Sequence, residues 1–115
     1  MNTNHSTDVV IIGAGPAGLF SAFECGMLDL TCHIIDSLAQ PGGQCAALYP
    51  EKPIYDIPAI PEISGGQLIE QLLEQAAPFE PTFHLSVTIE SLERKGEQWQ
   101  FKLSNQQTIH CNAII

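Results

Sequence analysis

Three glycines at a fixed spacing separate a short apolar run from a segment of helical character. Gly13, Gly15 and Gly18 form the pattern G-x-G-x-x-G directly after the apolar residues 9–12. In such a turn the first glycine allows a tight bend, the second lets a pyrophosphate approach the backbone, and the third lets helix and strand pack closely. Free N–H groups at the helix start also favour an anion. The pattern predicts a dinucleotide site, with a purely structural turn as the alternative.

An acidic residue follows where the ribose of such a ligand would lie. Asp36 ends a second apolar run, residues 31–36. In dinucleotide-binding folds a carboxylate about 20 residues after the glycines accepts a hydrogen bond from the ribose 2′-hydroxyl. Because a carboxylate repels a 2′-phosphate, the ADP half of FAD or NAD is favoured here over that of NADP. A turn or helix cap is the alternative role of Asp36.

The glycine motif requires a strand, a helix and a second strand around it. Residues 9–12 are a β-branched run typical of a strand buried on both faces. Residues 16–26 predict a helix, with Pro16 in its first turn and Gly26 as its stop. Residues 31–36 predict the second strand. A crossover of this kind implies parallel strands.

The second half of the chain predicts a loop, one more helix and a β-meander. Residues 37–62 contain five prolines, which favour a packed loop. Residues 64–78 predict a helix with a capping box formed by Ser64 and Gln67. Its apolar face consists of Leu68, Ile69, Leu72, Leu73 and Ala76. Residues 84–95, 98–104 and 107–111 alternate as antiparallel strands, and Trp99, Phe101 and Leu103 are expected on one face.

Composition limits the class of protein and its partners. The chain has 115 residues, enough for one domain, with 44% hydrophobic residues and a net charge of −9. Such acidity disfavours nucleic-acid binding, and we expect no membrane-spanning segment. The four cysteines lack C-x-x-C spacing, which predicts reduced thiols and a cytoplasmic location: Cys25, Cys32, Cys45 and Cys111. Cys45 follows a glycine-rich loop but has no partner cysteine nearby.

Longer stretches of the sequence resemble a known family. The segments DVVIIGAGPAGLFSAFECGM, IIDSLAQPGGQCAALYPEKPIYDIP and GGQLIEQLLEQAAPFEP are similar to ferredoxin–NADP+ reductases of the thioredoxin-reductase-like class. The more specific part is GGQ-x-x-ALYPEK-x-IYD. The resemblance covers residues 8–115 and implies a Rossmann-like FAD-binding α/β domain with a parallel sheet and an antiparallel β-meander. It also implies an incomplete domain, since such reductases are longer, and the apolar residues 111–115 read as the start of an unfinished strand.

The resemblance implies roles for individual residues. Ala17 would lie against the FAD phosphates through its backbone, and Asp36 would hold the adenosine ribose. Gln44 would hydrogen-bond toward the ribityl side of the flavin, and Tyr49 would stack on its ring, whereas Ile89 would meet the adenine edge. Turn or core packing is the alternative role of these last three. The full cofactor-binding set is Gly13, Gly15, Ala17, Gly18, Asp36, Gln44, Tyr49 and Ile89.

The function implied by the resemblance is electron transfer from NADPH through bound FAD to ferredoxin or a flavodoxin-like acceptor. The cofactor supplies the redox chemistry, so no catalytic side chain and no metal ligand are expected. The full-length enzyme would be a homodimer, and residues 1–115 alone, the N-terminal part of the FAD-binding domain, are expected to be inactive. A thioredoxin reductase and a non-catalytic FAD- or ADP-binding module are the alternatives.

Overall fold

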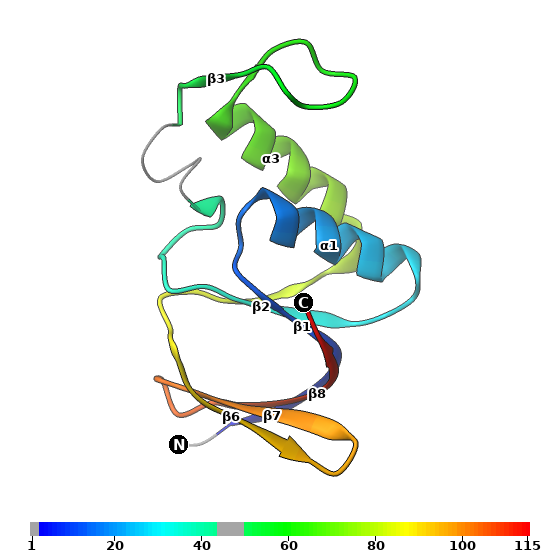
Figure 1. The fold of residues 1–115 in the computed structure, drawn as a ribbon, viewed down its shortest axis with the longest axis vertical. Helices are drawn as coiled ribbons and strands as arrows, with labels where there is room; N and C mark the ends of the chain where they lie inside the picture. The colour runs from blue at the N-terminus through cyan, green and yellow to red at the C-terminus, as the bar shows by residue number, and fades with distance from the viewer. Residues whose placement is uncertain (1–2, 44–49) are drawn as a thin grey trace.

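A computed structural model describes residues 3–43 and 50–115. Within these residues one sheet of six strands has the order β5-β2-β1-β8-β7-β6, and a separate pair is formed by β3 and β4. The strands β5, β2, β1 and β8 run parallel, whereas β7 and β6 continue the sheet antiparallel. The expected α/β class, with a parallel part and a meander, is confirmed, and the two parts share one curved sheet (Figure 1).

The predicted strand–helix–strand unit is present. β1 (Asn4–Ile12) leads into α1 (Pro16–Met27), and β2 (Cys32–Ile35) returns parallel to β1. The β1–β2 register runs from Val9 opposite Cys32 to Ile12 opposite Ile35. Val9, Val10 and Ile11 are buried, but Ile12 is 50% exposed at the carboxyl end of its strand. β1 therefore begins earlier than expected, and its last residue is exposed to solvent where the glycine turn starts.

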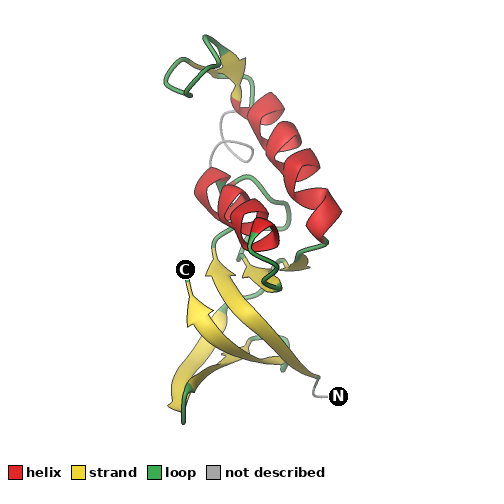
Figure 2. Ribbon diagram, turned by 90° about the vertical axis from the view of Figure 1, so that its right-hand side faces the viewer, coloured by secondary structure: helices red, strands yellow, loops and turns green. Residues whose placement is uncertain are grey.

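A second helix packs beside the first on one face of the sheet. α3 (Gly65–Ala76) continues into the short 3₁₀ helix η1 (Ala77–Phe79). The predicted capping box is confirmed, because Gln67 N–H donates to Ser64 Oγ at 3.1 Å and Ser64 N–H donates to Gln67 Oε1 at 3.3 Å. Figure 2 shows α1 and α3 side by side beyond one end of the strands. Leu19, Ile34 and Ile69 belong to the core beneath them.

The proline-containing segment between β2 and α3 is mostly irregular, as expected. Its described residues include a short antiparallel pair, β3 (Pro53–Ile54) and β4 (Ile63–Ser64), and an isolated bridge between Ile57 and Ile60. Further anchors come from the backbone, since Gly65 N–H donates to Lys52 O at 3.1 Å and Gly66 N–H donates to Pro50 O at 2.7 Å. The loop is thereby fixed to the start of α3.

The prediction of one strand over residues 84–95 is wrong. β5 (Thr82–His84) pairs parallel with β2, and only β6 (Ile89–Lys95) belongs to the meander. Ser86 has a positive φ of 58°, which an extended strand does not allow, and its N–H donates to Leu38 O at 3.0 Å. The chain therefore turns between two strands that belong to different halves of the sheet.

The end of the chain also differs from the expectation. Residues 107–111 and the apolar run that follows form one strand, β8 (Thr108–Ile114). β8 lies antiparallel to β7 (Gln98–Leu103) and parallel to β1, so it joins the two halves of the sheet. Phe101, Leu103 and Ile109 form a second buried core on this part of the sheet, with Trp99 packed against it. The shared face expected for Trp99, Phe101 and Leu103 is confirmed.

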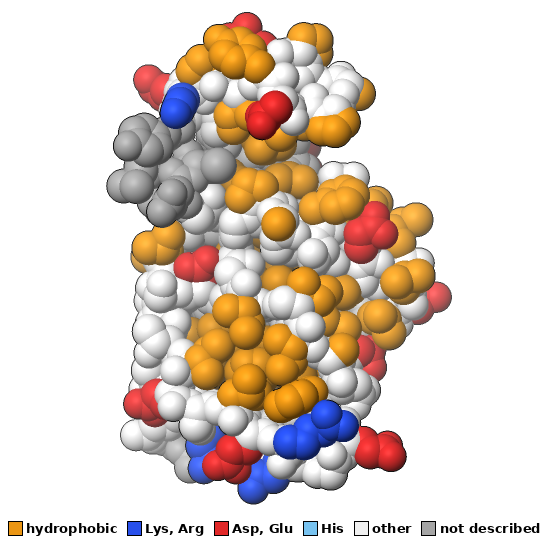
Figure 3. All heavy atoms as spheres, viewed as in Figure 1, with side chains coloured by type: hydrophobic (Ala, Val, Ile, Leu, Met, Phe, Trp, Pro, Cys, Tyr) orange, Lys and Arg blue, Asp and Glu red, His pale blue; other side chains and the backbone are white. Residues whose placement is uncertain are grey.

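Most of the basic residues lie in one region of the molecule. Three of the four, Arg94, Lys95 and Lys102, lie on β6 and β7, where blue side chains gather at the bottom of Figure 3. Acidic residues accompany them, and Lys95 pairs with Glu93 at 3.1 Å. Over the described residues, every helix is too short or too polar to cross a membrane.

Candidate dinucleotide-binding site

The glycine turn connects β1 to α1, and no side chain of the described residues caps the helix start. Gly13 has a φ of +102°, which favours glycine, and its N–H donates to Ile35 O at 2.8 Å. Gly15 occupies the N-cap position in an extended conformation, and no side chain caps the helix. A Cβ built on Gly15 would meet nothing within 4 Å. The first turn of α1 therefore presents open space above N–H groups that suit an anion.

Gly18 has a different reason to be glycine. A Cβ at this position would overlap the carbonyl oxygen of Gly13 and lie 3.3 Å from Cγ2 of Ile11. The helix thus packs directly on the turn and on β1. This is the close helix–strand contact that the third glycine of the motif permits.

Asp36 holds the glycine turn with one carboxylate oxygen and its own following loop with the other. Oδ2 accepts a hydrogen bond from Ala14 N–H at 2.7 Å, and Oδ1 accepts one from Leu38 N–H at 2.8 Å. Asp36 therefore does accept backbone hydrogen bonds in the way expected of a turn cap. Each carboxylate oxygen has a further lone pair, so these bonds leave acceptor capacity for a ligand hydroxyl. The role toward a ribose stays a prediction.

A surface pocket at the carboxyl ends of β1 and β2 brings several predicted residues together. This strand-end pocket has a volume of about 260 Å³ and is lined by Ile12, Gly13, Ile35, Asp36, Ser37, Val87, Thr88 and Ile89. Gly13, Asp36 and Ile89, which are far apart in the sequence, meet here. In open α/β sheets ligands bind outside the carboxyl ends of the strands, which is where this pocket opens.

The far wall of the strand-end pocket is the segment between β5 and β6. Val87 N–H donates to Asp36 O at 3.3 Å. Thr88 and Ser104 exchange two bonds, from Thr88 N–H to Ser104 Oγ at 3.0 Å and from Ser104 N–H to Thr88 O at 2.9 Å. Sequence reasoning missed Val87 and Thr88, because the alternation of residues 84–95 reads as one strand and gives no signal of the turn at Ser86.

The other predicted residues lie outside this pocket. Ala17 is exposed in the first turn of α1, beside the glycine turn. Gln44 and Tyr49 lie outside the described residues, as does Cys45. The glycines before them adjoin the turn: Gly42 N–H donates to Ala14 O at 2.7 Å, and a Cβ on Gly43 would lie 3.4 Å from the Cα of Gly15. The two glycine-rich loops are therefore neighbours.

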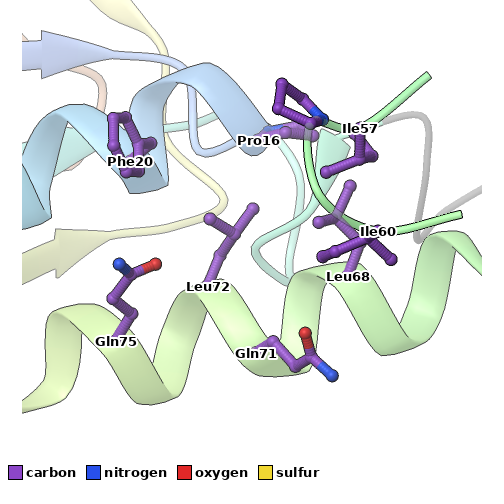
Figure 4. A pocket seen from close by; sticks show the side chains of 9 residues that line it. Pro16, Phe20, Ile57, Ile60, Leu68, Gln71, Leu72 and Gln75 are labelled. Carbon is purple, nitrogen blue, oxygen red and sulfur yellow. The ribbon is translucent and has the colours of Figure 1, made fainter. Parts of the chain in front are cut away.

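A larger apolar pocket opens between the two helices. This interhelical pocket has a volume of about 450 Å³ and is lined by Pro16, Phe20, Ile57, Pro58, Ile60, Leu68, Gln71, Leu72 and Gln75. Figure 4 shows Pro16 and Phe20 of α1 facing Leu68 and Leu72 of α3 across it. Its lining contains no charged side chain, so the phosphate-binding features belong to the glycine turn and the strand-end pocket.

The described cysteines are buried and have no partner in a disulfide. Cys25, Cys32 and Cys111 are buried free thiols, and burial raises the pKa of Cys32 to about 11. Burial also raises the pKa values of Cys25 and Cys111. Such thiols stay protonated near neutral pH and are poor nucleophiles. Within the described part of the chain, no cluster of histidine, cysteine or acidic residues has the arrangement of a metal site.

Known proteins are similar to this chain in sequence. A family profile for NAD(P)-binding Rossmann-like domains matches residues 11–60. A ferredoxin–NADP reductase of Wolbachia sp. subsp. Brugia malayi is 57% identical over 110 residues, which cover 95% of this chain and 32% of that protein. A ferredoxin–NADP reductase of Parvibaculum lavamentivorans is 50% identical over 111 residues, covering 96% of this chain and 32% of the relative.

Solved structures of lower identity share the fold. The thioredoxin reductase of Streptococcus pyogenes superposes with a TM-score of 0.81 at 24% identity, over 97% of this chain and 35% of that one. The thioredoxin reductase of T. acidophilum superposes with a TM-score of 0.82 at 22% identity, over 96% of this chain and 34% of that one. The present chain spans about a third of the length of the relatives that it matches. Its resemblance to ferredoxin–NADP reductases is thereby confirmed along nearly all of its own length, on the Rossmann-like fold that thioredoxin reductases share.

Proposed function

We propose that this chain is the FAD-binding part of a flavoprotein reductase that passes electrons from NADPH to ferredoxin or a similar one-electron acceptor. The observation that carries the proposal is the grouping of the open Gly13–Gly15 turn, the Asp36 carboxylate and Ile89 around one end of a parallel sheet. The names and 50–57% identity of the reductase relatives support this activity for a longer enzyme that contains the chain.

The residues present fit the ADP half of FAD. The pyrophosphate would lie over Gly15, where no Cβ occupies the space above the helix N-terminus. The adenosine would enter the strand-end pocket, with its ribose hydroxyl near Asp36 and its base against Ile89. A negative carboxylate disfavours the 2′-phosphate of NADPH, so NADPH would bind in another part of the longer enzyme.

The protein's contribution at this site is binding and orientation. Bound FAD supplies hydride acceptance from NADPH and release of single electrons. The glycine turn would hold the phosphates, and Asp36 would fix both the turn and the ribose. Gln44 and Tyr49 remain proposed contacts on the flavin side, and Ala17 remains a proposed backbone contact to the phosphates.

We also propose how this chain belongs to a longer enzyme. Residues 1–115 would be the N-terminal part of the FAD-binding domain, with the NADPH domain and further FAD contacts in the rest of a homodimeric enzyme. Buried free thiols at Cys25, Cys32 and Cys111 support a reducing, cytoplasmic location. Because the chain is acidic, with charge −9, an acidic ferredoxin would dock on another part of the enzyme.

Thioredoxin reductase is the second candidate, favoured by the shared fold of the solved neighbours. That activity needs a redox dithiol, and the cysteines of this chain lack C-x-x-C spacing. The distinction rests on whether the longer protein contains a C-x-x-C pair outside this segment.

The test uses a polypeptide of the relatives' length that contains this sequence. We expect it to purify with flavin absorbance that survives dialysis and bleaches when NADPH is added without oxygen. Reoxidation by ferredoxin, but not by thioredoxin, would support the main proposal over the second candidate. A colourless protein that stays colourless after incubation with FAD would overturn both.

A further inference from the structure

Three histidines lie together on the three neighbouring strands β1, β2 and β5. His33 on β2 and His84 on β5 are in hydrogen-bond contact, with Nδ1 of His33 2.8 Å from Nε2 of His84. Their ring centroids lie 5.0 Å apart, and the ring planes differ by 23°, so the two rings lie nearly in one plane. His5 of β1 lies 5.3 Å from His33 and 5.2 Å from His84 between ring centroids, and its Nε2 is 3.2 Å from Gln107 Oε1.

The contact between the two rings holds one proton. A hydrogen bond between two imidazole nitrogens needs one N–H donor and one bare nitrogen, so a second proton at the contact would break it. Among the described neighbours, the ring that faces the pair from β1 is another histidine, His5. The exposed carboxylates Asp29 and Glu80 lie at the pocket that His33 lines, and neither forms a bond to the pair.

The surroundings favour the neutral form of the pair. Burial, followed by the neighbouring His84 and His5, lowers the pKa of His33 to about 4. Burial and His5 also lower the pKa of His84, partly offset by a hydrogen bond to Gln107. Near pH 7 the hydrogen bond between His33 and His84 is therefore intact, and acidification destabilises it.

Beyond its ring, His84 connects directly to Asp36. The main-chain carbonyl of His84 accepts a hydrogen bond from Asp36 N–H at 3.0 Å. After the turn that follows β5, Val87 N–H donates to the main-chain carbonyl of Asp36 at 3.3 Å. β5 has only three residues and, in the described sheet, pairs with β2 alone. A strand so short at the edge of a sheet depends on additional contacts to stay in place.

We propose that His33 and His84 are a positioning pair for the strand-end pocket: their shared hydrogen bond clamps β5 to β2, and through β5 it fixes Asp36 and the wall formed by residues 87–89. Protonation of both rings opens the clamp and loosens the pocket. The relevance of this clamp to FAD rests on the proposed function.

The size of the effect follows from linkage. A histidine released from the clamp regains an ordinary pKa of about 6.5, whereas the clamped ring stays neutral down to about pH 4. Because the open form binds more protons, the titration of His33 alone raises its population relative to the closed form by about tenfold between pH 7.5 and 5.5. The clamp is stable above pH 6.5 and weakens as the pH falls below it.

Amide hydrogen exchange followed by NMR on the 115-residue chain measures this opening. We expect the opening constant of the Asp36 amide, corrected for intrinsic exchange, to rise about tenfold from pH 7.5 to 5.5. The Gly13 amide, which bonds to Ile35 O on the β1 side of β2, is the internal reference and should change little. An NMR titration of the His33 ring in the same sample should give a midpoint well below 6.5.

His33→Gln is the informative variant. A glutamine amide can turn its NH₂ group toward neutral His84 or its oxygen toward protonated His84, so the clamp should persist and the pH dependence at Asp36 should shrink. His110→Gln on β8, which changes a histidine outside the described cluster, is the matched control and should keep the wild-type dependence. FAD affinity should weaken toward pH 5.5 in the wild type and less in His33→Gln.

Two results would overturn the positioning pair: an Asp36 opening constant that stays constant between pH 7.5 and 5.5, or a His33 ring that titrates near 6.5 in the folded chain. The titration needs no variant, so a poorly folded His33→Gln leaves the inference decidable. If exchange and titration behave as expected but FAD does not bind at either pH, the clamp stands and the proposed function fails.

Discussion

Two glycines of the same motif are expected to respond to the same substitution in opposite ways. Gly18→Ala places a methyl group on the carbonyl oxygen of Gly13, and overpacking of this kind costs about 1–3 kcal/mol of unfolding free energy. Among the described residues, the methyl group of Gly15→Ala meets no atom within 4 Å, so its cost should stay below about 1 kcal/mol, but it fills the proposed phosphate position. Urea unfolding and FAD titration of both variants measure the two effects.

The pair of variants separates folding from binding. Gly15→Ala should be a stable chain with weakened FAD affinity, and Gly18→Ala an unstable one. Equal FAD affinity in Gly15→Ala and the wild type would show that no ligand approaches this residue.

Asp36→Asn tests the carboxylate that joins the turn to β2. An amide can accept only one of the two N–H bonds from Ala14 and Leu38 and presents its own N–H group to the other. Bonds to charged groups contribute about 1.5–3 kcal/mol each, so a loss of this order is expected in urea unfolding. FAD affinity should fall as well.

Asp29→Asn is the matched control for the charge change. Asp29 is exposed and has a positive φ of 58°, which asparagine also adopts. This variant should keep the stability and ligand affinity of the wild type. A similar loss in both variants would attribute the effect to net charge and not to the contacts of Asp36.

For single residues, the sequence predicted both where the candidate functional positions lie and why some of them must be glycine. The reasons for glycine at 13 and 18 and the place of Asp36 follow from the motif, because each is a local requirement of backbone and helix packing. The double use of the Asp36 carboxylate did not follow, since it depends on where the chain runs after residue 36. Val87 and Thr88 reach the pocket through long-range folding, which a local pattern does not encode.

At the scale of elements, the start of α3 depends on its capping box. Ser64→Ala removes the acceptor of the Gln67 N–H bond and should cost about 1 kcal/mol of unfolding free energy. Gln67→Ala keeps Ser64 Oγ as a cap and removes only the return bond of 3.3 Å, so it should cost less. Urea unfolding of the two variants gives the comparison, and equal losses would contradict the dominant role of Ser64.

The helices and the meander illustrate what periodicity encodes. The face formed by Leu68, Ile69 and Ala76 was predictable because a helix buries one side. The division of residues 84–95 was not, since an alternating pattern continues across the turn at Ser86. The partner of β8 was equally hidden: alternation predicts a strand, but only packing places it between β1 and β7.

At the scale of the whole molecule, mild acid should destabilise the fold. The folded chain holds His33 neutral to about pH 4, whereas the unfolded chain protonates it near 6.5. The unfolded state then binds more protons, so this contribution to stability is complete above pH 6.5 and is lost as the pH falls toward 4. Urea unfolding at pH 7.5, 6.5 and 5.5 should show the decline, with a weaker decline in His33→Gln. Equal slopes in the two proteins would contradict it.

The central claim is that the strand-end pocket and the glycine turn hold the ADP half of FAD, and one competition titration of the 115-residue chain tests it directly. The fluorescence of FAD is followed as the chain is added, and the complex is then challenged with ADP or with its 2′-phosphorylated analogue. The account predicts that FAD binds, that ADP displaces it, and that the 2′-phosphorylated analogue competes poorly because of Asp36. Failure of FAD and ADP to bind, or equal competition by the 2′-phosphorylated analogue, would contradict it.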